Sequence, residues 1–183
     1  MELACWEADA NQVSLREIMN WCLLNRSVDR MLVVLRLQQE GNRWRYAEPQ
    51  AGEFIQAGFG PHILTGFQAG EWPGTKASEP AFIYVLNFNE EVKEDVLQTQ
   101  PLLAKWLHGE QPALPEDICL FRESDTHPIF LSSTHHDLAW LLSVSDPAIP
   151  GFKKTNFAPG SFFPQGRYFC RKFEKRKTRR PIR

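Results

Sequence analysis

The chain has 183 residues, 43% of them hydrophobic and 23% charged, which favours one ordinary globular domain with an appendage and excludes an intrinsically disordered chain. Its net charge of −1 conceals a separation: residues 151–183 hold eleven Lys/Arg and one acid, net +10, whereas residues 1–150 hold ten Lys/Arg and 21 acids, net −11. We therefore expect a single acidic α+β domain over 1–150 and an aromatic, basic, partly disordered C-terminal extension over 151–183.

The first third of the chain predicts a helix and a hairpin. Ser14 and Glu17 have the spacing of a capping box, and an apolar stripe at helical period follows, so we expect a helix over residues 14–25. Residues 31–38 are rich in leucine and β-branched residues, which predicts a strand. A turn at residues 40–42, followed by alternating arginine and aromatic residues, indicates that this strand continues into a hairpin.

The middle of the chain is less regular. Residues 48–80 hold six of the eleven glycines and no sustained period, so we expect long connections there, with a short helix near Phe54. Residues 81–88 are apolar at both parities, which is typical of a strand that is covered on both faces. A helical pattern follows over residues 90–107.

Three further strands are predicted as a meander over residues 118–122, 128–133 and 138–144. Their apolar character at both parities places them centrally in a sheet. Helices and strands do not alternate strictly along the chain, which favours an α+β fold over a doubly wound one. We therefore expect a mixed, largely antiparallel sheet with two or three helices packed against it.

The best chemical cluster follows the second strand of the meander. Two consecutive histidines can serve one site only where the backbone turns, and a turn is predicted there. If Arg122 pairs near Pro128, the hairpin register brings two further carboxylates to the same end of the sheet. Such a group predicts either a divalent-metal site or the acid–base centre of a hydrolase, with an exposed polar turn as the alternative. The metal ligands would be Glu116, Asp117, His135 and His136, and the catalytic residues His135, His136 and Asp137.

The C-terminal segment is the second candidate site. Clustered Lys/Arg neutralise phosphates, so this segment predicts salt-sensitive contact with nucleic acid or another polyanion. A nuclear-localisation signal, a solvated chain end and a tail folded back onto the acidic body have the same composition, and these alternatives stay open. The cationic residues are Arg171, Lys172, Lys175, Arg176, Lys177, Arg179 and Arg180.

Six tryptophans are many for a chain of this length. Trp21, Trp106 and Trp140 fall in or beside predicted helices and strands, where core packing explains them. Trp44 and Trp72 lie in the hairpin or near loops, where aromatic residues are enriched at binding surfaces. An acidic surface that bears these tryptophans favours a basic protein partner.

The sequence contains no P-loop, nucleophile elbow or zinc-protease helix motif, so we expect no cofactor, and the lack of such motifs argues against an enzyme. Four widely spaced cysteines favour a reducing compartment, and the acidic N-terminus lacks the basic and apolar regions of a signal peptide. No run of eighteen apolar residues occurs, so we expect a cytoplasmic protein without membrane association.

These features predict a non-enzymatic cytosolic protein that binds another macromolecule through its acidic, aromatic-bearing body. A small acidic α+β protein of this kind resembles bacterial immunity and adaptor proteins in type, although in no motif. The alternatives are a metal-assisted or acid–base hydrolase centred on His135, His136 and Asp137, and nucleic-acid binding through the basic C-terminal tail.

Overall fold

In the computed structural model, the described residues are 4–99, 103, 117–125, 127–133, 136–142 and 144–156. The strands are β1 (Cys5–Asp9), β2 (Arg30–Glu40), β3 (Arg43–Tyr46), β4 (Ile63–Trp72), β5 (Thr75–Asn87), β6 (Ile118–Phe121), β7 (Phe130–Ser133), β8 (Leu138–Leu142) and β9 (Lys153–Thr155). The helices are α1 (Leu15–Arg26), α2 (Pro49–Phe59) and α3 (Glu90–Thr99), with a 3₁₀ turn η1 (Gly60–His62) after α2.

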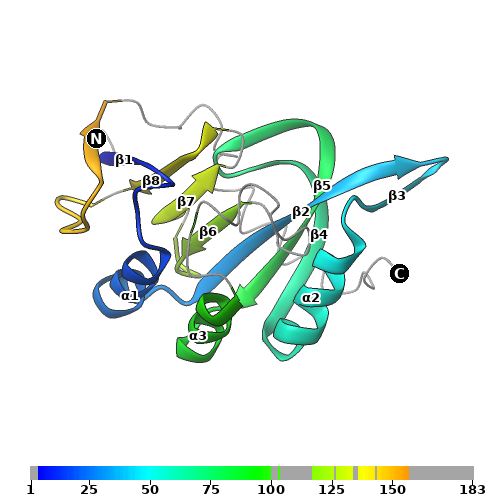
Figure 1. Ribbon diagram of the computed structural model, residues 1–183, viewed down its shortest axis with the longest axis horizontal. Helices are drawn as coiled ribbons and strands as arrows, with labels where there is room; N and C mark the ends of the chain where they lie inside the picture. Colours follow the sequence, from blue (N-terminus) through cyan, green and yellow to red (C-terminus); the bar gives the residue numbers. More distant parts are fainter. Residues whose placement is uncertain are drawn as a thin grey trace.

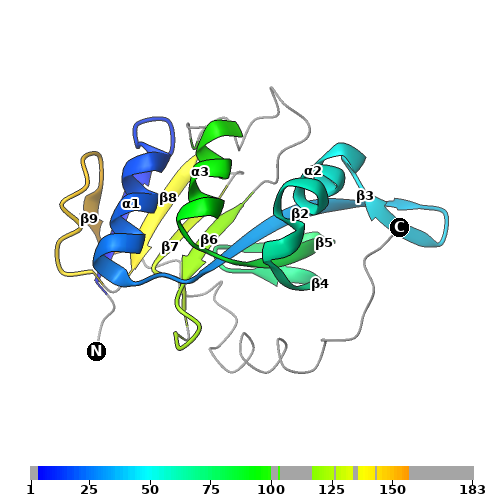
Figure 2. The same cartoon turned by 90° about the horizontal axis from the view of Figure 1, so that it is seen from below.

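One nine-stranded sheet organises the molecule, in the order β4-β5-β2-β6-β7-β8-β1-β9, and β3 pairs with the distal part of β2 (Figure 1). All of the strand pairs are antiparallel. The three α-helices lie on the same side of this sheet (Figure 2). The predicted α+β class is therefore confirmed. The sheet continues through Thr155, because β9 pairs with β1 at the edge of the sheet, beyond the domain boundary expected at residue 150.

Helix α1 forms as the sequence predicts. The Ser14 hydroxyl accepts a hydrogen bond from the Glu17 N–H (3.3 Å), which satisfies a backbone donor that the first turn leaves unpaired. The predicted apolar stripe is buried against the sheet, and its members are Leu15, Ile18, Met19 and Cys22. The helix is therefore fixed by its cap at one end and by burial along one face.

The short helix expected near Phe54 is confirmed by α2, but the expectation of long connections over the rest of residues 48–80 is wrong. That segment forms α2, η1, β4 and the first residues of β5. Two of its glycines permit close packing: a Cβ on Gly52 would lie 2.7 Å from the ring of Tyr46, and one on Gly66 would lie 2.8 Å from the ring of Phe82. The role of these two glycines is set by tertiary contacts, and a prediction from local sequence mistakes them for loop residues.

The hairpin predicted around residues 40–42 is confirmed, with Gly41 at φ +61° in the turn between β2 and β3. The three-strand meander is confirmed as β6, β7 and β8, which are buried almost throughout. Residues 81–86 of β5 are likewise buried at both parities. Helix α3 confirms the start of the helix predicted over 90–107, of which residues 100–102 and 104–107 lie outside the described part of the chain.

Apolar side chains fill both faces of the sheet. The larger cluster lies on the helix side and includes Ile18 of α1, Ile55 of α2 and Val92 of α3. The second cluster includes Cys119 and Leu131 from the central strands and Trp72 from the end of β4. Among the described residues, no helix has the length and apolar character needed to cross a bilayer.

The far end of the β4–β5 hairpin departs from the plane of the sheet. β5 pairs with β2 only from Ala81 onward, and before that residue it continues with β4 alone. Between the pairs Ala69↔Ala81 and Glu71↔Lys76 the register shifts, because residues 77–80 of β5 form a bulge. The two strands curve together away from β2 (Figure 1). The bulge thus allows this end of the hairpin to turn over the second apolar cluster.

Candidate functional site

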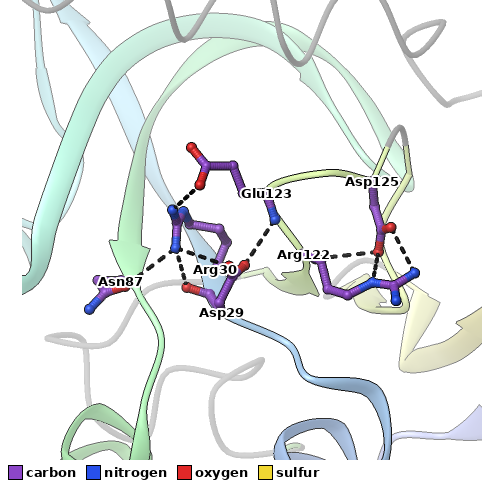
Figure 3. A network of polar contacts seen from close by, with 6 residues as sticks. All are labelled: Asp29, Arg30, Asn87, Arg122, Glu123 and Asp125. Atoms are coloured by element: carbon purple, nitrogen blue, oxygen red, sulfur yellow. Dashed lines mark hydrogen bonds and ion pairs between the residues drawn. The ribbon is translucent and has the colours of Figure 1, made fainter.

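One end of the sheet gathers charged side chains from three segments that are distant in sequence: the start of β2, the end of β5 and the turn after β6 (Figure 3). Backbone hydrogen bonds join these segments. The Asp29 N–H donates to the Phe121 carbonyl (3.3 Å), and the Phe88 N–H donates to the Asp29 carbonyl (2.9 Å). Antiparallel pairing of β2 with β5 and β6 is what brings the three strand ends together.

Arg30 is the centre of this polar network. Its Nη1 donates to the Asp29 carbonyl (2.9 Å) and to Asn87 Oδ1 (3.3 Å), and its Nη2 donates to Glu123 Oε2 (2.6 Å). The Glu123 N–H in turn donates to Asp29 Oδ1 (2.9 Å). The guanidinium therefore links β2, β5 and the turn after β6 (Figure 3), and a planar group with several fixed donors suits this task.

The turn after β6 is held by a second arginine. Arg122 forms a two-point ion pair with Asp125, in which Nε lies 2.9 Å from Oδ2 and Nη2 lies 2.9 Å from Oδ1. The hydrogen bond to Asp125 raises the pKa of the Arg122 guanidinium, so this arginine keeps its charge. Both arginines are thus engaged with carboxylates of the same region.

Carboxylates outnumber the cations Arg30, Arg122 and Lys93 at this end of the sheet, although the Lys93 ammonium bonds Glu90. Helix α3 follows β5 here, with the Val92 N–H donating to Asn89 Oδ1 (3.0 Å), and carries two exposed glutamates in its first turn. The His62 Nε2 lies 3.5 Å from Glu91 Oε2. Glu123 is 75% exposed although it bonds Arg30. We call this surface the acidic rim, and it consists of Asp29, Glu90, Glu91, Glu123 and Asp125.

An aromatic and aliphatic surface adjoins the acidic rim. Helix α1 ends at Arg26, three residues before Asp29, and its Leu24 is 78% exposed. Trp21 on the same helix is half-buried, with the Arg26 guanidinium 5.6 Å from the centre of its ring. The last turns of α1 therefore present apolar surface beside the carboxylates.

The predicted metal and acid–base cluster is only partly described. The predicted register is confirmed, because the pair Leu120↔Phe130 continues to Arg122 opposite Pro128. Asp117, however, is 1% exposed and accepts hydrogen bonds at Oδ2 from Trp72 Nε1 (2.6 Å) and Thr75 Oγ1 (3.2 Å). Its carboxylate therefore binds the β4–β5 hairpin.

The histidine turn itself begins outside the described residues, which omit Glu116 and His135. His136 is exposed, and Asp137 adopts φ 53° while its carbonyl accepts from the Ala10 N–H (2.8 Å). Within the described ranges, no three His, Cys, Asp or Glu side chains are placed to hold a metal ion.

The two tryptophans expected at a binding surface differ. Trp72 is 3% exposed and its indole N–H is bonded to Asp117, so the expectation that it lies at the surface is wrong. An indole at the end of a hairpin gains from burial when a carboxylate can accept its N–H. Trp44 on β3 is half-buried and packs against the larger cluster. The cationic residues between Arg171 and Arg180 lie outside the described residues.

Sequence reasoning missed the acidic rim. Its local signal is a charged or amide residue at each strand end: Arg30 before an apolar run, Asn87 at the close of another, and Arg122 after a third. That signal becomes a site only once the pairing of β2 with β5 and β6 is known. Chemically the acidic rim offers exposed carboxylates, of which Glu123 is positioned by Arg30, and such groups suit the cationic groups of a partner. No family model, curated protein or solved structure matches the chain.

Proposed function

We propose that the protein is a non-enzymatic cytoplasmic binding protein whose acidic rim and adjoining α1 surface dock a basic protein partner. The observation that carries this proposal is the group of five carboxylates at this end of the sheet, of which Glu123 bonds Arg30 and Asp29 bonds the Glu123 N–H, together with exposed Leu24 and half-exposed Trp21 on α1. Interfaces combine aromatic or aliphatic anchors with charged groups at their margins, and this surface offers both.

The hydrogen bonds of the acidic rim bear directly on its affinity for cations. Carboxylates that are already positioned lose little side-chain freedom when a cationic partner binds, so less of the attraction is spent on ordering. The −11 charge of residues 1–150 adds a long-range field that speeds the approach of a basic protein. Binding of this kind weakens as salt is added, because the Debye length falls from about 10 Å at 0.1 M to about 3 Å at 1 M.

A charge-matched pair of variants tests the proposal. The rim variant carries Glu91→Lys and Glu123→Gln, and the glutamine keeps an oxygen for Arg30. The control variant carries Glu48→Gln and Glu53→Lys, which make the same change in net charge at exposed positions at the start of α2. Proteins captured from a lysate of the native host by the wild type and both variants are quantified by mass spectrometry.

We expect at least one basic protein to be retained by the wild type and the control variant and lost from the rim variant. Titration of that purified protein then gives its dissociation constant at rising salt, which we expect to increase by about tenfold or more. A captured set that is identical for the rim and control variants, or binding indifferent to salt, would remove the acidic rim from the proposal.

The two other functions predicted from sequence receive less support. For the hydrolase, Asp117 is engaged with Trp72 and Thr75 rather than presented to a substrate. The cationic residues between Arg171 and Arg180 lie outside the described residues, so nucleic-acid binding rests on the +10 charge of residues 151–183 alone. Both stay predictions.

A further inference from the structure

The end of the β4–β5 hairpin, residues 71–76, is here called the hairpin tip, and it rests on the second face of the sheet. Trp72, Gly74 and Thr75 in it are all buried. Gly74 adopts φ +85° and packs so closely on β7 that a Cβ there would lie 2.7 Å from Leu131 Cδ1. The tip is therefore docked on the central strands by close contact.

Polar docking of the tip converges on one buried carboxylate. The Trp72 indole N–H (2.6 Å) and the Thr75 hydroxyl (3.2 Å) both donate to Asp117 Oδ2. Hydrogen bonds to a charged acceptor are about twice as strong as those between neutral groups, so loss of either donor weakens the docking substantially. If the tip moved away from Asp117, the Trp72 N–H and the Thr75 hydroxyl would lose their shared acceptor together.

The connection between the tip and the rest of the sheet is weak. Residues 77–80 form the β5 bulge, in which Ser78 and Glu79 are exposed and Pro80 has no N–H to donate. In the residues before Ala81, β5 has no pairing with β2. Segments with few ladder bonds and exposed irregular backbone open at a lower free energy than the core does.

Two buried polar side chains on this face of the sheet also lower the free energy needed to open the tip. Ser133, which the register places opposite Asp117, is buried and its hydroxyl has no hydrogen-bond partner. A buried hydroxyl without a partner has lost its hydrogen bonds to water and gained none within the protein, and exposure restores the bonds to water. The Asp117 carboxylate regains water in the same step.

We propose that the hairpin tip is a latched cover that opens locally, without unfolding of the helix side, and uncovers the sheet face that carries Cys119. Cys119 lies two residues after Asp117, on the same face of β6, and is the cross-strand partner of Leu131 on which the tip rests. While the cover is closed, burial first and the Asp117 charge second raise the pKa of the Cys119 thiol, so it does not react.

Alkylation of the native full-length chain tests this, with Cys22 as an internal reference. Cys22 lies on the buried face of α1, in the other cluster, and burial also raises the pKa of its thiol. The chain is exposed to excess iodoacetamide, and modification at each cysteine is followed over time by peptide mass spectrometry. Local opening predicts that Cys119 is modified at least tenfold faster than Cys22, with little dependence on low concentrations of urea.

Variants assign the opening to the latch. Trp72→Phe keeps the ring but removes the N–H, and it should speed Cys119 modification by about tenfold or more. Gly74→Ala should act in the same direction through its clash with Leu131, whereas Gly70→Ala, which meets no atom within 4 Å, should have little effect. Ile18→Val on the helix side lowers the stability of the closed form and of the locally open form by the same amount. It therefore leaves the opening of the tip unchanged and should speed modification of Cys22 alone.

Two results would overturn the proposal. Equal rates at Cys119 and Cys22 in the wild type, rising together in Ile18→Val, would mean that both thiols are reached only through global unfolding. A Cys119 rate unchanged by both Trp72→Phe and Gly74→Ala would mean that the tip does not cover that residue.

Discussion

Ser132 and Ser133 are neighbours on β7 with opposite hydrogen-bonding outcomes. The Ser132 hydroxyl accepts from the Ile118 N–H (2.9 Å), whereas the Ser133 hydroxyl is buried without a partner. We expect Ser132→Ala to lower the free energy of unfolding by about 1 kcal/mol, because the Ile118 N–H loses its acceptor. Ser133→Ala should leave it unchanged or raise it by up to about 1 kcal/mol, because no bond is lost. Urea denaturation of both variants checks this, and equal losses would contradict it.

The bonds of Lys93 lead to a prediction about how the stability of the fold depends on pH. Its mostly buried ammonium bonds Glu90, Asn20 (2.9 Å) and Glu94 (3.2 Å), and the bond to Glu90 is the main cause that raises the pKa of Lys93 above the ordinary value of 10.5. A raised pKa favours the protonated form in the folded state. The stabilisation that these bonds give is therefore complete below pH 10.5 and is lost as the pH rises through the pKa of Lys93 in the folded state.

We expect Lys93→Met to lower the free energy of unfolding by a constant amount between roughly pH 7 and 9, and by a shrinking amount above pH 10.5. Urea denaturation at a series of pH values gives the difference from the wild type. Lys76→Met at an exposed position is the control, and its difference should not vary over the same range. A Lys93→Met difference that grows with alkalinity would contradict the assignment.

At the scale of single elements, α2 contains a matched pair of glycines. A Cβ on Gly52 would meet the Tyr46 ring at 2.7 Å, whereas a Cβ on Gly58 meets nothing within 4 Å. We expect Gly52→Ala to cost about 1–3 kcal/mol through overpacking, and Gly58→Ala to add up to about 1 kcal/mol through helix propensity. Thermal or urea unfolding measures both. If both variants changed the free energy of unfolding in the same direction, helix propensity and not the Tyr46 contact would set the effect at Gly52.

Elements with strong local signals could be predicted from the sequence. The cap at Ser14 with the stripe behind it identified α1, and the apolar run over residues 81–86 identified the buried part of β5. The failure over residues 48–80 has a physical cause. Glycines that admit an aromatic ring, and two register shifts in β4, remove the periodicity on which a local prediction depends.

The candidate site could be predicted only in fragments. Local pairing placed Asp117 correctly near the start of β6, but its partner Trp72 lies 45 residues away in sequence, and no pattern connects the two. The acidic rim has the same difficulty, since Arg30 and Glu123 are 93 residues apart. Chemistry assembled by long-range pairing becomes visible only when the strand order is known.

At the scale of the whole molecule, Arg30 connects parts of the sheet that local contacts do not. We expect Arg30→Met to lower the free energy of unfolding by about 2 kcal/mol, because Asn87 Oδ1 and Glu123 Oε2 lose this donor and the Asp29 carbonyl keeps only the Phe88 N–H. Arg122→Met should cost less than about 1 kcal/mol, because the ion-pair partner of Arg122, Asp125, is only three residues away in the same turn. Urea denaturation compares the two, and an equal or reversed order would contradict a linking role for Arg30.

The position of β1 has a consequence for how the protein is made. Cys5 pairs with both Leu142 and Thr155, so β1 has no sheet neighbour until β8 and β9, which lie far later in the chain, have been synthesised. The β2–β5 pairing can form much earlier, because its strands are close in sequence. Biosynthesis therefore leaves one side of the sheet for last, and β1 remains unpaired and open to aggregation until β8 emerges to pair with it.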